Sequence, residues 1–200
     1  MNADEGKIYE IIFHGRGGQG LITGMEILAD VAFEDGFKDV LTIPIIGAER
    51  RGAAIRAFLR LSPNRQIKSF SAITTPDITV IFDQTLLELP GVGDSIKKGI
   101  VLLNASDNFE YSFPEEVEVY YVNATRICVE EKLIIAGSPL LNVPMAGAFI
   151  KIMKELKLDT LKVVLEERFG SKAELNMKAA IRAYNELKSG PILNRCEVNP

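Results

Sequence analysis

The chain has 200 residues, enough for one domain that buries roughly 70% of the surface its unfolded form exposes. Hydrophobic residues make up 47% and charged residues 25%, which excludes a disordered or fibrous protein and is typical of a soluble globular one. The 23 Lys and Arg residues and 27 Asp and Glu residues give a formal charge of −4 without a block of like charge. We therefore expect no nucleic-acid partner.

The chain has two cysteines, Cys128 and Cys196, which are far apart and have no His, Cys or carboxylate at metal-ligand spacing. We expect thiols of a reducing compartment rather than a disulfide, a zinc site or a cluster site, and no bound metal. The acidic N-terminal residues lack the order of a signal peptide, which predicts a cytoplasmic protein. Leu133 to Ile150 carries no charge, but prolines and glycines interrupt it. A buried strand, a loop and a helix start are expected there, not a membrane span.

The first forty residues predict a strand, a glycine turn and a helix. Residues 8–13 are a β-branched and aromatic run, followed by four glycines between Gly15 and Gly20. From Gln19 to about Glu34, apolar residues recur at three- and four-residue spacing, as in a helix packed on one side. This order is the first half of a βαβ unit.

The middle of the chain predicts further strands. They are expected at residues 40–46, 53–61, 78–82, 99–103 and 117–122. Pro44 indicates that the first of these ends or bends, and a polar turn at 47–52 precedes the alternating pattern of the second. The later apolar runs are typical of a central parallel sheet, with short helical stretches at 85–88 and 94–98 between them.

The last third of the chain is helical in its pattern. Three helices are expected, at 145–156, at 161–168 with Asp159 as its cap, and from a capping box of Ser171 and Glu174 to about Lys188. No repeat or linker divides the chain. The sequence therefore predicts one α/β domain over residues 1–200, with a mostly parallel, Rossmann-like sheet and a helical C-terminal layer.

The glycine turn matches the pattern G-x-G-x-x-G at Gly15, Gly17 and Gly20. Such a turn lets a phosphate approach the backbone and the amide donors of a helix start. The candidate cofactor-binding residues are Gly15, Arg16, Gly17, Gly18, Gln19 and Gly20. A dinucleotide site also needs an acidic residue at the end of the second strand, but Asp35 and Asp39 precede that strand and Glu49 lies beyond it.

Two alternatives remain open for this turn. The glycines also suit a tight turn that packs closely against a neighbouring chain. The guanidinium of Arg16 suits a carboxylate, a phosphate or an acidic residue of a partner, and equally a solvated surface position.

Four segments in order carry a resemblance to a known family. Phe13–Gly20, Gly47–Ala53, Asn142–Ala148 and Asn176–Tyr184 resemble the gamma subunit of pyruvate and related 2-oxoacid:ferredoxin oxidoreductases. The resemblance implies one subunit of a larger enzyme, not active alone, that decarboxylates a 2-oxoacid with thiamine diphosphate and passes electrons to iron–sulfur clusters. It commonly delivers the acyl group to coenzyme A, which is a co-substrate.

The same resemblance implies where the cofactors and partners lie. Thiamine diphosphate, Mg²⁺ and [4Fe-4S] clusters are expected on other subunits, with alpha, beta and delta-type chains as partners and ferredoxin or a similar protein as electron acceptor. Pockets on those chains set which 2-oxoacid is used. The absence of closely spaced cysteines in this sequence agrees with that division.

The other candidate residues lie in the second and third family-like segments. Glu49, Arg50 and Arg51 suit ion pairing across a subunit interface or a phosphate of coenzyme A, or else form a solvated turn. Asn142 is a candidate helix cap, Pro144 suits a first helical turn, and Met145 is either core filler or part of a docking face. No catalytic residue is assigned. Alternative functions are an independent Rossmann-type dinucleotide-binding oxidoreductase and a non-catalytic scaffold subunit.

Overall fold

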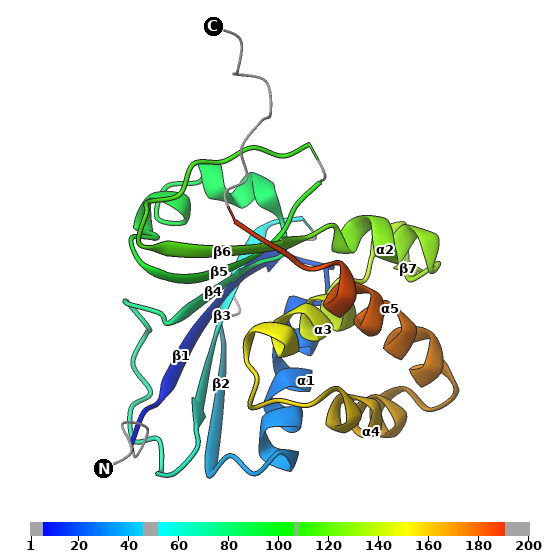
Figure 1. The fold of residues 1–200 in the computed structure, drawn as a ribbon, viewed down its shortest axis with the longest axis horizontal. Helices are drawn as coiled ribbons and strands as arrows, with labels where there is room; N and C mark the ends of the chain where they lie inside the picture. The colour runs from blue at the N-terminus through cyan, green and yellow to red at the C-terminus, as the bar shows by residue number, and fades with distance from the viewer. Residues whose placement is uncertain (1–5, 46–51, 107, 191–200) are drawn as a thin grey trace, which may run out of the picture.

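A seven-stranded sheet forms the centre of the computed structural model, which describes residues 6–45, 52–106 and 108–190. The strands lie in the order β2-β3-β1-β4-β5-β6-β9 (Figure 1). Their bounds are Tyr9–Arg16 for β1, Asp39–Ile45 for β2, Ala54–Ser62 for β3, Ile78–Ile81 for β4, Gly99–Asn104 for β5, Val117–Val122 for β6 and Lys188–Ser189 for β9.

The sheet is mostly parallel. β1, β4, β5 and β6 pair in parallel, and β2 runs in the same direction because β3 is antiparallel to both β2 and β1. Besides β3, only the short β9 runs the other way among the described strands. Residues 46–53 connect β2 to β3 and are too few for the crossover between parallel strands, which takes about a dozen residues or more. β3 therefore runs antiparallel to β2, and its other edge pairs with β1. The predicted α/β fold class is confirmed.

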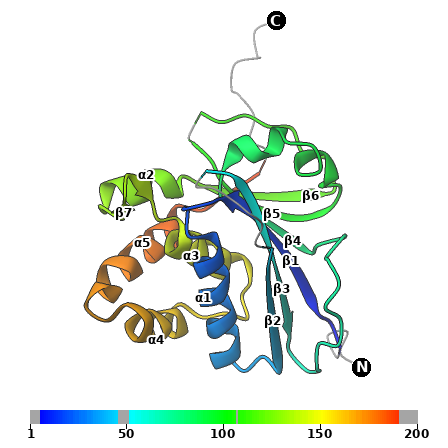
Figure 2. The same cartoon turned by 180° about the vertical axis from the view of Figure 1, so that it is seen from behind.

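The five α-helices of the described residues lie on one face of the sheet (Figures 1 and 2). They are α1 (Leu21–Glu34), α2 (Ala124–Glu130), α3 (Asn142–Ile152), α4 (Leu158–Phe169) and α5 (Ala173–Glu186). α3 is the innermost: every residue from Asn142 to Ile150 is buried. It packs on α1 and α5, and the main apolar core lies between these helices and the sheet. The predicted helical C-terminal layer is therefore present.

The opposite face of the sheet is covered differently. Over β4, β5 and β6 lie two short 3-10 helices, Gln84–Glu88 and Gly93–Ser95, and they help to enclose a smaller core. No α-helix of the described chain covers the other half of this face, over β1 and β3 (Figure 2). Side chains of those two strands therefore border a hollow.

Three local predictions near the glycine turn need correction. β1 does not end at Phe13 but continues through Gly15 and Arg16, because β3 supplies pairing partners for both. The helix begins at Leu21 rather than Gln19, after Gly20 in a left-handed conformation with φ +80°. α2 is a further difference. This short helix was not predicted, and the Asn123 side chain caps its first turn.

Helix ends in the last third also differ from the predictions. Asp159 lies in the first turn of α4 and is not its cap. The capping box of Ser171 and Glu174 is wrong, because the 3-10 turn Gly170–Lys172 runs directly into α5 and leaves no extended cap residue. α5 ends at Glu186, before Lys188, since Lys188 and Ser189 pair with β6.

The uncharged stretch from Leu133 to Ile150 contains a small hairpin and most of α3. The hairpin pairs β7 (Ile134–Ile135) with β8 (Ser138–Pro139), and its two isoleucines are exposed, so the prediction of a buried strand is wrong. α3 begins at Asn142, three residues earlier than predicted. Within the described parts of the chain, no helix combines the length and the apolar character needed to cross a bilayer.

Candidate functional site

Polar side chains meet at the carboxyl ends of β1, β4 and β5. Arg16, Gln19, Asp83 and Thr85 are joined by hydrogen bonds, and Asn104 at the end of β5 donates to the carbonyl of Phe82, next to Asp83. We call these five residues the polar edge. In open α/β sheets, ligands bind outside the carboxyl ends of the parallel strands. The polar edge is therefore the first candidate for a functional site.

The Arg16 side chain is bonded within the chain. Its Nε donates to Asp83 Oδ2 at 2.9 Å, one terminal nitrogen donates to Thr85 Oγ1 at 2.7 Å, and the other to the Gly52 carbonyl at 3.2 Å. All three nitrogens thus have acceptors, on two segments that are distant in the sequence. Among the roles that the sequence left open for Arg16, this geometry favours an internal ion pair.

Asp83 is the centre of the polar edge. Its Oδ1 accepts from the backbone N–H and the hydroxyl of Thr85, and its Oδ2 accepts from Arg16 and from Gln19 Nε2. Burial raises the pKa of this carboxyl, but the hydrogen bonds from Thr85 and the Arg16 charge outweigh burial and hold the pKa below its usual value. Asp83 is not among the predicted site residues, although it closely follows the buried strand β4 at its carboxyl end.

Backbone and side-chain bonds fix the glycine turn in one shape. Gln19 Oε1 accepts from the Arg16 N–H at 2.8 Å, and the Gln19 N–H donates to the Arg16 carbonyl at 3.2 Å. Gly17 donates to Ala53 O and accepts from the Gly52 N–H, which extends the pairing of β1 with β3 into the turn. Gly18, at φ +95°, is the exposed tip.

Two of the three motif glycines allow close packing inside the chain. A Cβ on Gly15 would lie 2.6 Å from Leu21 Cδ1, and one on Gly20 would lie 3.1 Å from Asn142 Cβ. Gly24, one turn further along α1, would meet the backbone of Asn142 at 3.2 Å. These close approaches all lie within the chain. Packing of the turn against a neighbouring chain and binding of a cofactor by residues 15–20 both stay predictions.

Asn142 and Met145 are both internal. Asn142 is the first residue of α3 and the cap position is Leu141, so the prediction that Asn142 caps the helix is wrong. Its Oδ1 is buried and has no hydrogen-bond partner among the described residues. Pro144 lies in the first turn as predicted. Met145 is 1% exposed, which favours core packing over a docking face.

The third and fourth family-like segments lie against each other. They form α3 and α5, and the inward face of α5 carries buried small residues at Ala179, Ala180 and Ala183. Gly147 of α3 sits where a Cβ would reach within 2.3 Å of the Ala180 carbonyl oxygen. Both segments therefore make packing contacts within the helical layer.

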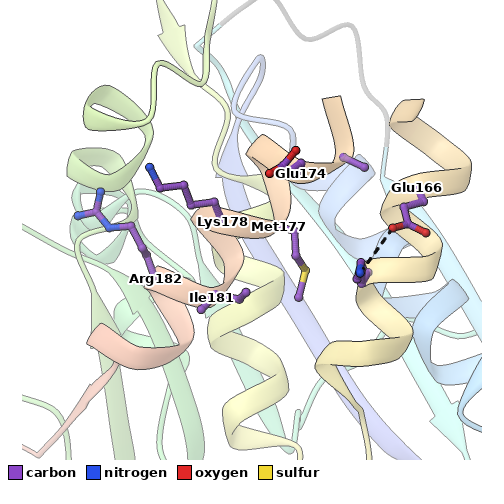
Figure 3. A pocket seen from close by; sticks show the side chains of 8 residues that line it. Glu166, Glu174, Met177, Lys178, Ile181 and Arg182 are labelled. Atoms are coloured by element: carbon purple, nitrogen blue, oxygen red, sulfur yellow. Dashed lines mark ion pairs between the residues drawn. The ribbon is translucent and has the colours of Figure 1, made fainter. Parts of the chain in front are cut away.

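The outward face of α5 borders a groove with α4 (Figure 3). Met177 and Ile181 give it an apolar lining, and a Lys162–Glu166 ion pair lies on the α4 side. The groove has a volume of about 530 Å³. Because the groove is formed by α4 and α5, whereas the polar edge is formed by strand ends, the two are separate features.

The remaining predictions concern the charged residues 49–51 and the two cysteines. Glu49, Arg50, Arg51 and Cys196 lie outside the described residues. Cys128 is a buried free thiol whose Sγ donates to the Leu140 carbonyl at 3.1 Å, and burial raises its pKa to about 12. In the described ranges, no group of three or more His, Cys, Asp or Glu side chains could hold a metal ion.

The sequence model of the family "Pyruvate ferredoxin/flavodoxin oxidoreductase" matches residues 10–186. The chain belongs to this family. The match spans all five α-helices and six of the seven strands of the central sheet, apart from the first residue of β1. The resemblance that the four segments suggested is therefore confirmed.

Two members of the family are similar to this chain over nearly their whole length. The pyruvate synthase subunit PorC of Methanothermobacter thermautotrophicus is 38% identical over 181 residues, which cover 90% of this chain and 96% of that protein. The pyruvate/ketoisovalerate oxidoreductases common subunit gamma of Thermococcus kodakarensis is 36% identical over 88% of this chain and 96% of its own length.

Solved structures share the fold. The pyruvate oxidoreductase subunit PORC of Thermotoga maritima superposes with a TM-score of 0.74 at 30% identity, over 92% of this chain and 99% of that one. A 2-oxoglutarate:ferredoxin oxidoreductase of Magnetococcus marinus, solved with 2-oxoglutarate, coenzyme A and succinyl-CoA, gives a TM-score of 0.70 at 22% identity. The match covers 94% of this chain and 33% of that longer one, so the family fold also occurs as one part of a larger chain.

Proposed function

We propose that this chain is the gamma subunit of a thiamine-diphosphate-dependent 2-oxoacid:acceptor oxidoreductase. The complex would convert a 2-oxoacid such as pyruvate, with coenzyme A, into acyl-CoA and CO₂, and pass the electrons to ferredoxin or a similar acceptor. The observation that carries this proposal is the nearly full-length match, in both directions, to proteins named as subunits of such enzymes.

Thiamine diphosphate, Mg²⁺ and [4Fe-4S] clusters belong to the alpha, beta and delta-type partners in this proposal. When bound there, thiamine diphosphate supplies the carbanion chemistry of decarboxylation. The cluster of Arg16, Gln19 and Asp83 holds the glycine turn rigid, so that the exposed tip at Gly18 meets a larger subunit in one fixed shape. Such preorganisation suits a surface that borders a reaction site.

Glu49, Arg50 and Arg51 also have a proposed role at the interface. They precede β3 in the sequence, and the first residues of β3 pair with the end of β1. The two arginines would pair with acidic residues across the interface or with a phosphate of coenzyme A.

Purification of the complex from its native source tests the proposal. An affinity tag on this chain should recover chains that carry thiamine diphosphate and iron–sulfur clusters, with 2-oxoacid-dependent and coenzyme-A-dependent reduction of ferredoxin. Recovery of the chain by itself, in active form, would contradict the proposal.

Titration of the isolated chain separates the two alternatives. Tight binding of NADH or FAD with dehydrogenase activity would favour an independent dinucleotide-binding enzyme. A complex that keeps its full activity after removal of this chain would favour the non-catalytic scaffold.

A further inference from the structure

Phe70 is the most exposed large hydrophobic side chain of the described residues, at 71%. It lies on the loop of residues 63–77, which connects β3 to β4 and which we call the Phe70 loop. The two isoleucines of this loop, Ile67 and Ile73, are buried. The loop therefore packs its isoleucines on the protein and leaves the ring of Phe70 in solvent.

A buried arginine holds the backbone on both sides of Phe70. The neighbours of Arg60 on β3 are core residues, so its side chain points to the face of the sheet away from the α-helices. Its terminal nitrogens donate to the carbonyl oxygens of Ser69 at 3.2 Å and Ser71 at 2.9 Å, and its Nε donates to Glu10 at 2.8 Å. One guanidinium thus joins the residues that flank the ring to the central sheet.

Further hydrogen bonds restrain the Phe70 loop. The hydroxyl oxygens of Ser69 and Ser71 share a hydrogen bond at 2.8 Å, and the Ile67 N–H donates to Asp39 Oδ2 at 2.7 Å. A loop that is already ordered loses little freedom when it binds, which removes one cost of association. Aromatic side chains are enriched at protein–protein interfaces. An exposed aromatic ring on a restrained loop is therefore preorganised to enter a pocket on another molecule.

The charge around Phe70 is positive. Residues 63–76 include Arg65 and Lys68 and contain no Asp or Glu. Both cations are exposed, and no ion pair joins either of them to another residue of the described ranges. The carboxylates of Glu10 and Asp39, which contact this loop, are hydrogen-bonded within the chain. A surface that complements the Phe70 loop therefore carries carboxylates around an apolar centre.

An anionic membrane is the other surface that suits an aromatic ring between cations. Recognition of anionic lipids by basic segments uses roughly four to eight Lys and Arg residues, and stable attachment takes more than one anchoring group. The Phe70 loop offers one exposed ring and the two cations Arg65 and Lys68. These numbers favour a protein over a membrane.

We propose that Phe70 anchors a partner protein by inserting into an apolar pocket whose rim carries Asp or Glu side chains. Arg65 and Lys68 pair with that rim, and Arg60 keeps the loop in the shape that the pocket receives. Arg60 contacts β1 near its start, whereas the glycine turn follows the end of β1, so this is a second surface. That the partner belongs to the same oxidoreductase rests on the proposed function, but the docking itself does not.

A photo-crosslinking analogue of phenylalanine at position 70 identifies the contact. The tagged full chain that carries it is expressed in the native source and irradiated in cells, and the cross-linked peptides are identified by mass spectrometry. We expect cross-links to one site on one partner, with apolar side chains at its centre and Asp or Glu around it. Cross-links scattered over many proteins, or a site without carboxylates, would overturn the proposal.

Variants of the ring test its share of the binding. Phe70→Ala should weaken binding to the purified cross-linked partner about thirtyfold or more in calorimetry, as expected for an anchoring side chain. Phe70→Tyr keeps the ring and should retain most of the affinity. Phe33→Ala is the matched control, because it removes another exposed ring, on α1, and it should leave the affinity unchanged.

A charge variant tests the acidic rim. Lys68→Glu should weaken binding several-fold at low salt and less at high salt, because salt screens the repulsion between exposed carboxylates. A loss of affinity that does not change with salt would contradict the pairing of this loop with an acidic rim.

Other outcomes separate this proposal from the proposed function. Equal affinity of Phe70→Ala and the original chain, or an equal loss with Phe33→Ala, would overturn the docking and leave the proposed function intact. A cross-linked partner that belongs to no 2-oxoacid oxidoreductase would support the docking and contradict the proposed function. If vesicles of phosphatidylserine and phosphatidylcholine bind the original chain but not Phe70→Ala, the loop is a membrane anchor instead.

Discussion

Gly147 in α3 lies directly against the backbone of Ala180 in α5, so that a Cβ at position 147 would come within 2.3 Å of the Ala180 carbonyl oxygen. The contact is between backbones, and a backbone cannot rotate away as a side chain can. These two residues belong to the third and fourth family-like segments, which are far apart in sequence. Their contact sets how closely the outer helix approaches the inner one.

Gly147→Ala should therefore destabilise the chain. The added methyl group forces α3 and α5 apart, at a cost of roughly 1–3 kcal/mol, as for overpacked cores. Urea unfolding followed by circular dichroism measures the loss. Glu174→Ala, an exposed change in the first turn of α5, is the control and should stay within about 0.5 kcal/mol of the original chain. Equal midpoints for Gly147→Ala and the control would contradict the prediction.

Asp83→Asn should destabilise the chain at neutral pH and have less effect in acid. Because the folded-state pKa of Asp83 lies below the usual value, its carboxylate stabilises the fold above the ordinary aspartate pKa of about 3.9, and this stability is lost as pH falls through the folded pKa. The original chain should be more stable than the variant at pH 7, and the difference should shrink below pH 4. Thermal unfolding from pH 3 to 7 tests this, and a constant difference would refute it.

His14 should make the chain less stable in mild acid. Its pKa is about 4 in the folded chain and 6.5 unperturbed, so between these values the unfolded chain binds a proton and the folded chain does not. Stability should be fully present above pH 6.5 and fall by roughly 2–3 kcal/mol on the way to pH 4. His14→Gln should flatten this part of the profile. An NMR titration midpoint of His14 near 6.5 would show that burial does not act as argued.

Arg182→Gln should loosen α5 from α2. Arg182 donates to Glu131 at 2.7 Å and to Glu130 at 2.6 Å. Its removal takes this cation from Glu130, whereas Glu131 keeps only its ion pair with Lys178 at 2.8 Å. We expect the unfolding midpoint to fall by roughly 3–6 °C. Lys162→Gln breaks an exposed pair with Glu166 and should change the midpoint by less than about 2 °C. An equal effect of both changes would argue against the α2–α5 contact.

Arg50→Glu should weaken the complex or its use of coenzyme A, under the proposed function. A reversed charge would repel an acidic partner surface or a phosphate. Recovery of partner subunits in a pull-down and the KM for coenzyme A measure the two effects separately. If complex assembly and coenzyme A kinetics both stay unchanged, neither role holds for this residue.

The α/β class and the helix α1 were predictable because periodicity is a local property. Leu21, Met25, Leu28 and Ala32 are buried at the spacing that a helix on a sheet requires. The ends of the helices and strands were less predictable, since pairing with strands from elsewhere in the chain decides them. β9 shows this: only the exposed edge of β6 turns Lys188 and Ser189 from a helix end into a strand.

The polar edge shows the same limit at a site. The sequence singled out Arg16 and Gln19 but not Asp83, because the residue that receives their hydrogen bonds is 64 positions or more away in the chain. Glu49, Arg50 and Arg51 remain predictions from the family resemblance.

By itself, the sequence determined the fold class and the family, because apolar periodicity and motif order are written in consecutive residues. Only the tertiary structure decided what the conspicuous residues do. It turned Arg16 inward to Asp83, placed Gly15 and Gly20 where a Cβ would crowd the side chains of Leu21 and Asn142, and buried Asn142 and Met145. These outcomes depend on which distant segments come within a few ångströms of each residue, and no local pattern encodes that.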